Sequence, residues 1–417
     1  PSKSARLALT MGKVQGWSRF KTLAGLRGQT CGRIGNFLYL PSLNIIFRLY
    51  LMKVPFLNLV AQYESLKAEL LPVVEKVLAS GHYVLGPNVA AFEQECAAYV
   101  GARYGVGVNS GSDALTLALR ALDIGPGDEV ITTPFTYIAP AESIYQVGAR
   151  IVFADVDPRT FIIDPKEIRR KISPRTKAII PVHLFGQAAP MHEIQEIAAQ
   201  HNLHIIEDCA QAIGATCGGR PVGSIGTLGC FSFYPTKNLG ADGDGGMVVT
   251  NDEALARKLK MLRGHGIERR YYHDLHGYNS RLDELQAAIL RVKLPHLKGW
   301  NDRRAAIAQC YMAALKDLPL ELPVVAGGNN HIYHVFAVLT DSRDALQQRL
   351  ADRGVPTIIY YPLPLHLQKL YADLNFQKGE YPVAEALSAR ILPLPMYPEL
   401  TDEQVDYVAG VIREFFS

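Results

Sequence analysis

The chain of 417 residues carries a formal net charge of +3, with 48% hydrophobic and 20% charged residues. This is the composition of a globular protein long enough for two domains, and no apolar run approaches the roughly 20 residues of a membrane helix. The six cysteines are scattered without paired spacing, which disfavours a disulfide framework or a structural zinc site and favours a reducing, cytoplasmic location.

The first 51 residues differ from the rest of the chain. They hold eight basic residues and no acidic one, whereas the remainder holds 35 basic and 40 acidic residues. We interpret residues 1–51 as a basic extension that is disordered or not part of the natural protein; a targeting segment or a basic tail are the alternatives. The remaining body is mildly acidic, which disfavours nucleic acid as a partner.

Three amphipathic patterns after residue 62 predict helices. "YESLKAELLPVVEKVLAS" has apolar residues at helical spacing and ends at Gly81, a residue typical of a helix stop. "VAAFEQECAAYVG" is the second pattern and "SDALTLALRALDIG" the third. Either Ser112 or Asp113 is expected to cap the start of the third helix.

Short β-rich runs follow at regular intervals: "EVITTP", "RIVFADV", "KAIIPVHLFG", "LHIIEDC", "GCFSFY" and "GMVVTN". Several are continuously apolar, which is typical of strands in a parallel sheet with both faces covered by helices. Strand and helix patterns alternate over some 150 residues, which predicts an α/β domain.

The pattern changes after about residue 295. "LKGWNDRRAAIAQCYMAALKDL" predicts a long helix, followed by the strand "YHVFAVLT" and the helices "SRDALQQRLADRG" and "TDEQVDYVAGVIREFFS". We therefore expect a large domain over residues 52–295 and a smaller C-terminal α+β domain over residues 296–417.

Four predicted strands are followed by residues that could carry chemistry. They offer the turn Asn109–Ser112 before a helix, Tyr137, Asp208, and Lys237 within "FYPTKNLGADGDGG". Ligands of open α/β sheets bind beyond the carboxyl ends of the strands. Each residue also has an ordinary interpretation: a helix cap, a packing aromatic, an N-cap carboxylate or a solvated lysine.

Together these groups match the requirements of pyridoxal phosphate. A neutral lysine amine adds to its aldehyde, a carboxylate keeps its pyridine nitrogen protonated, and a helix N-terminus favours its phosphate. Gly243, Gly245 and Gly246 would allow a tight turn beside such a cofactor. The chain has neither the glycine spacing of a dinucleotide loop nor that of a P-loop.

The chain from about Val54 onward resembles the DegT/DnrJ/EryC1/StrS family of sugar aminotransferases. The matching stretches include "GPNVAAFEQECAAYVG", "VNSGSDALTLALRALDIGPGDEVITTPFTYIA", "IIEDCAQAIGA", "GCFSFYPTKNLGADGDGGMVVTND" and "GYNSRLDELQAAIL", in the family's order. The resemblance implies an aspartate-aminotransferase-like fold (PLP fold type I) and pyridoxal 5'-phosphate as cofactor. Residues 1–51 lie outside it.

The resemblance also implies roles for single residues. Lys237 would be the catalytic residue that forms the Schiff base and moves protons, and Asp208 would pair with the pyridine nitrogen. The other cofactor-binding residues would be Gly111, Ser112 and Ser232 at the phosphate, Gln211 at the ring hydroxyl and Tyr137 stacked on the ring. Asn279 would reach the cofactor phosphate of the neighbouring subunit, so the active sites would be shared within a homodimer.

The implied reaction moves an amino group from an amino acid donor, with glutamate expected, to a nucleotide-linked keto sugar. "VHLFGQ" resembles a stretch of members that act on 3-keto sugars, which favours C3 over C4 and leaves dTDP and UDP open. Tyr360 stands where the resemblance predicts a histidine in "IIYYPLPLHLQ", so the ring substituents of the sugar also stay open. The resemblance implies that sugar dehydratases of the superfamily have histidine at the position of Lys237. The lysine of this chain therefore disfavours a dehydratase.

A non-catalytic regulatory protein that keeps the fold is an alternative. The segment "RGHGIERRYYHDLHGYN" could be a nucleic-acid patch, but an interface loop that places Asn279 is favoured. His201 and His204 lack a third ligand, so no metal site is predicted, and Asp155 and Asp157 are expected to be turn carboxylates.

Overall fold

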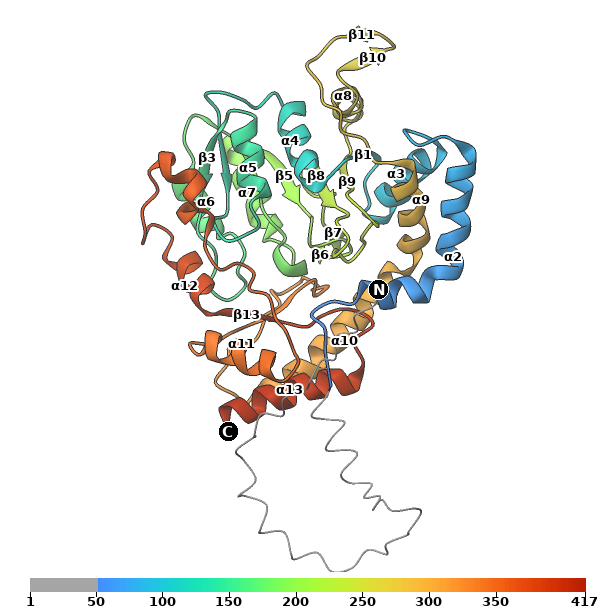
Figure 1. Ribbon diagram of the computed structural model, residues 1–417. Helices are drawn as coiled ribbons and strands as arrows, with labels where there is room; N and C mark the ends of the chain where they lie inside the picture. Colours follow the sequence, from blue (N-terminus) through green and yellow to red (C-terminus); the bar gives the residue numbers. More distant parts are fainter. Residues whose placement is uncertain (1–51) are drawn as a thin grey trace, which may run out of the picture. The chain divides into compact units, whose positions relative to one another are not determined.

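The computed structural model describes residues 52–417 (Figure 1). The interpretation of residues 1–51 as a basic extension lies outside the described residues.

A seven-stranded sheet forms the centre of the larger part of the molecule (Figure 1). Its strands, in spatial order, are β1 (Tyr104–Val108), β9 (Gly246–Thr250), β8 (Leu228–Ser232), β5 (His204–Asp208), β4 (Thr176–Ile179), β2 (Glu129–Thr132) and β3 (Arg150–Phe153). The five strands from β8 to β3 are parallel, and β9 runs antiparallel to both of its neighbours. The predicted α/β fold with a mainly parallel sheet is confirmed.

Helices cover both faces of this sheet. One hydrophobic core involves α4 (Gly111–Ala121), α5 (Ala139–Gln146), α6 (Pro165–Lys171), α7 (Met191–His201) and α8 (Glu253–Arg263); the other involves α3 (Pro87–Tyr99) and α9 (Glu284–Lys293). In β9, Val248 belongs to the first core, whereas Met247 and Val249 belong to the second. Burial on both faces explains why the strands are continuously apolar in sequence. Helix α2 (Leu59–Ser80) packs on α9.

The C-terminal part has a core of its own. Its elements are α10 (Leu297–Leu315), β12 (Phe336–Leu339), α11 (Arg343–Asp352), α12 (Pro382–Arg390), β13 (Ile391–Leu394) and α13 (Asp402–Phe416). Strands β12 and β13 pair antiparallel, and α10 and α11 pack against α13 (Figure 1). The predicted smaller α+β part is therefore present, while the boundary between residues 295 and 296 stays a prediction.

Short elements complete the described chain. They are β6 (Thr216–Cys217), β7 (Arg220–Pro221), β10 (Ile267–Arg269), β11 (Tyr272–His273) and the 3₁₀ helices η2 (Leu184–Gly186), η3 (Leu294–His296), η4 (Leu365–Leu367) and η5 (Lys369–Leu374).

The predicted end of α2 is confirmed, whereas the predicted start of α4 is not. Helix α2 stops at Gly81, whose φ of 67° lies in the left-handed region, as the sequence predicts. The expected cap of α4 is wrong, because α4 begins at Gly111. The hydroxyl of Ser110 accepts the N–H of Asp113 at 3.1 Å, so Ser110 is the cap.

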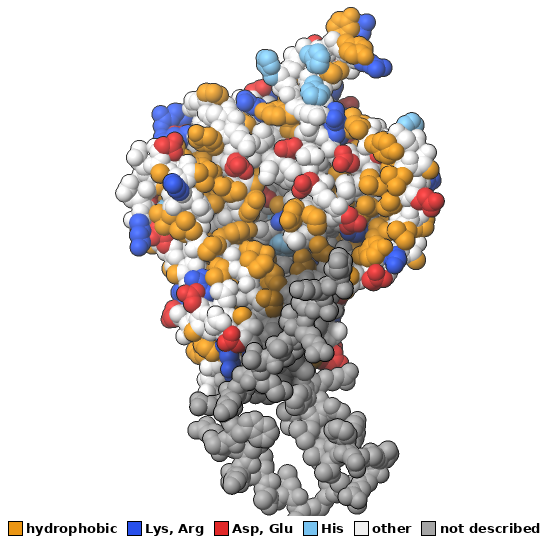
Figure 2. Space-filling view, in the orientation of Figure 1, with side chains coloured by type: hydrophobic (Ala, Val, Ile, Leu, Met, Phe, Trp, Pro, Cys, Tyr) orange, Lys and Arg blue, Asp and Glu red, His pale blue; other side chains and the backbone are white. Residues whose placement is uncertain are grey.

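A hairpin of β10 and β11 projects from the body of the described chain (Figure 1). Its tip gathers basic, histidine and hydrophobic side chains (Figure 2), and Tyr271 and Tyr272 are exposed there. The five cysteines among the described residues are free thiols. Within residues 52–417, no helix has both the length and the apolar character needed to cross a membrane.

Candidate active site

A cavity of about 400 Å³ opens where β1, β2, β5 and β8 end. Seven of the eight predicted site residues line it: Gly111, Ser112, Tyr137, Asp208, Gln211, Ser232 and Lys237. Strands far apart in sequence place these residues together because parallel strands end at the same edge of a sheet. The eighth, Asn279, is not among the lining residues.

Lys237 follows β8 in a tight turn, where its backbone N–H donates to the carbonyl of Tyr234 at 2.8 Å. Removal from water lowers the pKa of the Lys237 amine from 10.5 to about 8, and the nearby Asp208 carboxylate opposes this shift. A substantial fraction of the amine is therefore neutral near pH 8, as a nucleophile or a general base requires. The interpretation of Lys237 as an ordinary solvated loop lysine does not fit this environment.

Asp208 is the last residue of β5 and is buried. Its Oδ1 accepts the N–H of Ala210 at 3.0 Å, and its Oδ2 has no hydrogen-bond partner among residues 52–417. Burial raises the pKa of this carboxyl, while the bond to Ala210 and the charge of Lys237 lower it. A carboxylate oxygen without a protein partner, in a cavity wall, fits a protonated ring nitrogen of a ligand.

The start of α4 forms one wall of the cavity. Ser110 caps only the N–H of Asp113, so the N–H groups of Gly111 and Ser112 have no partner within the helix. A Cβ on Gly111 would lie 2.6 Å from the Cβ of Ser232, so only glycine allows this approach of α4 and β8. Free N–H groups beside a serine hydroxyl are a suitable cradle for a phosphate.

Gln211 and Tyr361 form a hydrogen-bonded pair on another wall. The Oε1 of Gln211 accepts the N–H of Phe185 at 2.8 Å, and its Nε2 donates to the Tyr361 hydroxyl at 2.9 Å. The second N–H of the Gln211 amide stays available for a ligand. Tyr137 is 59% exposed, so its ring is free to cover a flat ligand from one side.

Asn279 lies at the base of the β10–β11 hairpin, where it forms a bridge with Gly264. The next residue, Ser280, donates a hydrogen bond of 2.5 Å to Asp113 in α4 and accepts the N–H of Asn109 at 3.1 Å. The chain around Asn279 is thus tied to the wall of its own cavity, although Asn279 does not line it. The role of Asn279 in a neighbouring subunit stays a prediction.

Sequence reasoning missed several lining residues. His334 and Tyr361 come from the C-terminal part of the chain and face the cavity with Tyr360. No local sequence pattern marks either residue as part of the site. They lie about 100 residues beyond Lys237 in the chain and reach the cavity only through tertiary packing. The resemblance had singled out position 360 only as a departure from the expected histidine.

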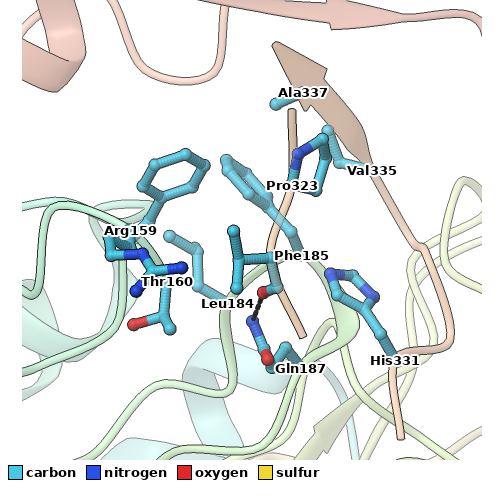
Figure 3. Close-up of a pocket in the computed structure, with 11 residues that line it drawn as sticks. Arg159, Thr160, Leu184, Phe185, Gln187, Pro323, His331, Val335 and Ala337 are labelled. Atoms are coloured by element: carbon cyan, nitrogen blue, oxygen red, sulfur yellow. Dashed lines mark hydrogen bonds between the residues drawn. The ribbon is translucent and has the colours of Figure 1, made fainter. Parts of the chain in front are cut away.

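A second, much smaller cavity lies beside the segment 331–335 (Figure 3), and Val335 lines both cavities. Phe185, Gln187, His331 and Val335 line it with residues of the turn at 159–161, and its volume is about 10 Å³. That is room for about one water molecule, so this cavity is not a substrate site.

The buried cluster of His183, Glu207 and Cys209 has donors at metal-ligand spacing. It is not suited to a metal, because Glu207 already accepts hydrogen bonds from His183 and from three backbone N–H groups. Burial also raises the pKa of the Cys209 thiol well above its usual value. Asp157 accepts backbone N–H groups within its own turn, as predicted. The prediction is incomplete for Asp155, whose carboxylate accepts the N–H groups of Val383 and Ala384 at the start of α12, a contact made only by tertiary packing.

The residues present fit pyridoxal phosphate: a lysine amine of lowered pKa, a buried carboxylate with one unpaired oxygen and an open helix N-terminus face one cavity. The mainly parallel sheet and the smaller C-terminal part complete the architecture. Fold and site define the class of pyridoxal-phosphate-dependent enzymes with an aspartate-aminotransferase-like fold.

The chain belongs to the DegT/DnrJ/EryC1/StrS aminotransferase family, whose model matches residues 64–413. It is 49% identical over 368 residues to a pleiotropic regulatory protein of Geobacillus stearothermophilus, covering 88% of this chain and 99% of the relative. It is 50% identical over 360 residues to a UDP-N-acetyl-3-dehydro-alpha-D-glucosamine 3-aminotransferase of Acidithiobacillus ferrooxidans, covering 86% and 97%. A dTDP-3-amino-3,4,6-trideoxy-alpha-D-glucose transaminase of Streptomyces venezuelae is 47% identical over 364 residues, covering 87% and 96%.

The crystal structure of S. venezuelae DesV in complex with a ketimine intermediate is similar to this chain. Its TM-score is 0.86 at 46% identity, over 88% of this chain and 99% of that one. Other similar solved structures hold the cofactor as PMP or are described as a PLP form. Pyridoxal phosphate is therefore the cofactor of this aminotransferase.

Proposed function

We propose that the protein transfers an amino group from an amino acid, with glutamate as the expected donor, to C3 of a nucleotide-linked 3-keto sugar. The single observation that carries the transfer chemistry is the Lys237 amine, whose pKa of about 8 suits a group that takes up and returns a proton. The sugar and its C3 position are supported by the relatives from A. ferrooxidans and S. venezuelae. Both dTDP and UDP stay possible as the nucleotide.

Pyridoxal phosphate, when bound, would supply an aldehyde that takes up the amino group as an amine and a ring that accepts electrons. Lys237 is proposed to hold the aldehyde before the donor arrives, and then to remove and deliver the proton of the substrate carbon. Its neutral amine accepts the proton, and the resulting ammonium returns it to a neighbouring atom.

The other site residues are proposed to position the cofactor. The free Oδ2 of Asp208 would pair with the ring nitrogen, and the remaining N–H of Gln211 would donate to the ring hydroxyl. Gly111, Ser112 and Ser232 would hold the phosphate at the start of α4. Tyr137 would stack on the ring.

We propose that the active form is a homodimer in the cytoplasm. Large apolar side chains are exposed along and after α2 (Figure 2): Leu59, Val60, Tyr63, Leu71, Leu78, Tyr83, Val84 and Leu85. Exposed large apolar side chains in this number favour contact with a second copy of the chain. The segment around Asn279, at the base of the projecting hairpin, would then lie at the interface and present Asn279 to the cavity of the partner subunit.

A non-catalytic regulatory role is the second candidate, because the relative from G. stearothermophilus is named a regulatory protein. The intact set of Lys237, Asp208 and Gln211 favours catalysis over loss of chemistry.

A substrate panel with two controls tests the proposal. The full chain with pyridoxal phosphate and glutamate is offered dTDP- and UDP-linked 3-keto and 4-keto sugars, and mass spectrometry detects amination. Borohydride reduction followed by peptide mapping should place the cofactor on Lys237, and Lys237→Arg should abolish both signals, whereas the exposed Lys298→Arg should keep both. If only the 4-keto sugars are aminated, the amino group is transferred to C4 and the proposed C3 position is wrong. If no sugar is aminated although Lys237 is labelled, the regulatory role is supported.

A further inference from the structure

A chain of three side chains leads from the protein interior to the cavity beside Lys237. Asn301 in α10 contacts Asn238, the residue after the lysine, and Asn238 contacts His334 in the cavity wall. None of the site roles described above uses these three residues. Their hydrogen bonds determine which nitrogen of His334 carries a proton.

The two amides have only one favourable orientation. The Nδ2 of Asn301 donates to the carbonyl of Ile213 at 3.1 Å, and the Nδ2 of Asn238 lies 3.3 Å from the carbonyl of Ile332. A backbone carbonyl can only accept, so flipping either amide would place two oxygens against each other. The Nδ2 of Asn238 also donates to the Oδ1 of Asn301 at 2.7 Å, which agrees with the same orientation.

This orientation fixes the tautomer of His334. The Oδ1 of Asn238 faces the Nδ1 of His334 at 3.0 Å, so Nδ1 must carry the hydrogen. Burial, helped by the charges of Lys237 and Arg304, lowers the pKa of His334 well below its usual value. The imidazole is therefore neutral, and its Nε2 has a free lone pair with no hydrogen-bond partner among the described residues.

The backbone that carries His334 is held rigidly. The N–H of Ile332 donates to Gly186 at 2.9 Å, and Val335 donates to Phe185 at 3.3 Å. The buried Arg304 donates to the carbonyls of Tyr333 at 3.2 Å and Met396 at 2.8 Å. His331, seen in Figure 3, has the opposite arrangement: its Nδ1 accepts the N–H of Tyr333 at 2.9 Å, and its ring stacks on that tyrosine.

We propose that His334 is a positioning residue for Lys237: once formed, the Lys237 ammonium turns to donate a hydrogen bond to the lone pair on Nε2 of His334. The two side chains line the same cavity and are not hydrogen-bonded to each other in the structure. No proton is transferred to His334. The inference rests on the proposed function in one respect: the ammonium forms when Lys237 takes the proton from the substrate carbon. A fixed acceptor then keeps the amine aimed at the reacting atoms until the proton is returned, because a neutral imidazole cannot repel the ammonium.

Labelling of Lys237 in the cofactor-free full chain tests this proposal independently of sugar turnover. The titratable side chains that share the cavity are Asp208, Asp244, Tyr137, Tyr234, Tyr360, Tyr361 and His334. The extent of amine modification at Lys237 is followed by mass spectrometry against pH for the native chain, His334→Phe and His334→Gln. We expect His334→Phe to lower the midpoint pH of Lys237 labelling by half a pH unit or more, because the acceptor for the ammonium is lost. In His334→Gln the side-chain oxygen can accept instead, so the midpoint should return most of the way to the native value.

A second measurement keeps the proposal falsifiable if His334→Phe fails to fold. Nitrogen NMR of the ¹⁵N-histidine-labelled chain, with the His334 signal assigned from His334→Gln, should show a protonated Nδ1 and an unprotonated Nε2. An unchanged labelling midpoint in a folded His334→Phe, or a hydrogen on Nε2, would overturn the proposal. A protein that shows the expected midpoints and tautomer but aminates no sugar would refute the proposed function alone.

Discussion

The carboxylate of Glu207 lies 3.0 Å from the Nε2 of His183, and both side chains are fully buried. Because the Nδ1 of His183 accepts the N–H of Ala189, its Nε2 is the donor in this pair. Glu207 also accepts the N–H groups of Gly223, Ile225 and Gly226, so its acceptor positions are filled. This pair anchors β5 immediately before Asp208.

Glu207→Gln should therefore destabilise the protein strongly. The amide would direct N–H groups toward backbone N–H donors, and we expect a loss of roughly 2–4 kcal/mol in the free energy of unfolding. Urea unfolding of the purified chain measures it. The exposed Glu196→Gln is the control, with an expected change within about 0.5 kcal/mol. Equal stability of the two variants would contradict the anchoring role.

Asp208→Asn should lower the pKa of Lys237 below about 8, because the Asp208 carboxylate stabilises the ammonium form. The pH dependence of amine labelling at Lys237 in the cofactor-free chain measures this shift. Asp244→Asn is the matched control, since Asp244 lines the same cavity but is not a cause of the Lys237 shift. A rise of the midpoint in Asp208→Asn would contradict the assigned electrostatics.

The lowered pKa of Lys237 predicts a pH dependence of stability. The unfolded chain binds a proton at Lys237 up to about pH 10.5, whereas the folded chain releases it near 8. The unfolded state therefore holds more protons between these values, and stability should rise over this range. Chemical unfolding of the cofactor-free chain at several pH values measures it relative to Lys237→Met, which lacks the titrating group. A constant difference between the two proteins would contradict the prediction.

Gly111→Ala should weaken cofactor binding, because the added methyl would lie 2.6 Å from the Cβ of Ser232 and push α4 away from β8. We expect a loss of roughly tenfold or more in affinity for pyridoxal phosphate, equivalent to about 1.4 kcal/mol. Titration by absorbance measures it. Gly299→Ala in α10 is the control, because its Cβ would meet nothing within 4 Å. An unchanged affinity of Gly111→Ala for pyridoxal phosphate would contradict the proposal that the start of α4 binds the phosphate.

Mixing two inactive variants should restore activity if the sites are shared. A heterodimer of Lys237→Ala and Asn279→Ala has one cavity with both residues intact, so random assortment predicts about a quarter of native activity. Native mass spectrometry of the mixture, with one variant carrying a tag of different mass, checks that heterodimers have formed. Activity that never exceeds that of the separate variants, in a mixture shown to contain heterodimers, would argue against the role of Asn279.

Much of this site could be predicted from sequence because its residues follow strands. A strand of continuous apolar residues ends where a polar residue appears, and parallel strands end at one edge, so Asp208 and Lys237 were expected to be neighbours. The start of α4 was located less well. The sequence predicts its cap at Ser112 or Asp113, whereas the helix begins at Gly111 because the Ser110 hydroxyl accepts the N–H of Asp113.

Local order in the sequence thus determined the α/β fold, the helix stop at Gly81 and the strand-end residues, because periodicity and turn chemistry act over a few residues. Only the tertiary structure brought His334 and Tyr361 to Lys237 and left an oxygen of Asp208 unpaired. Those facts depend on contacts between segments about 100 or more residues apart, whose geometry is set by packing and hydrogen-bond direction rather than by any local pattern.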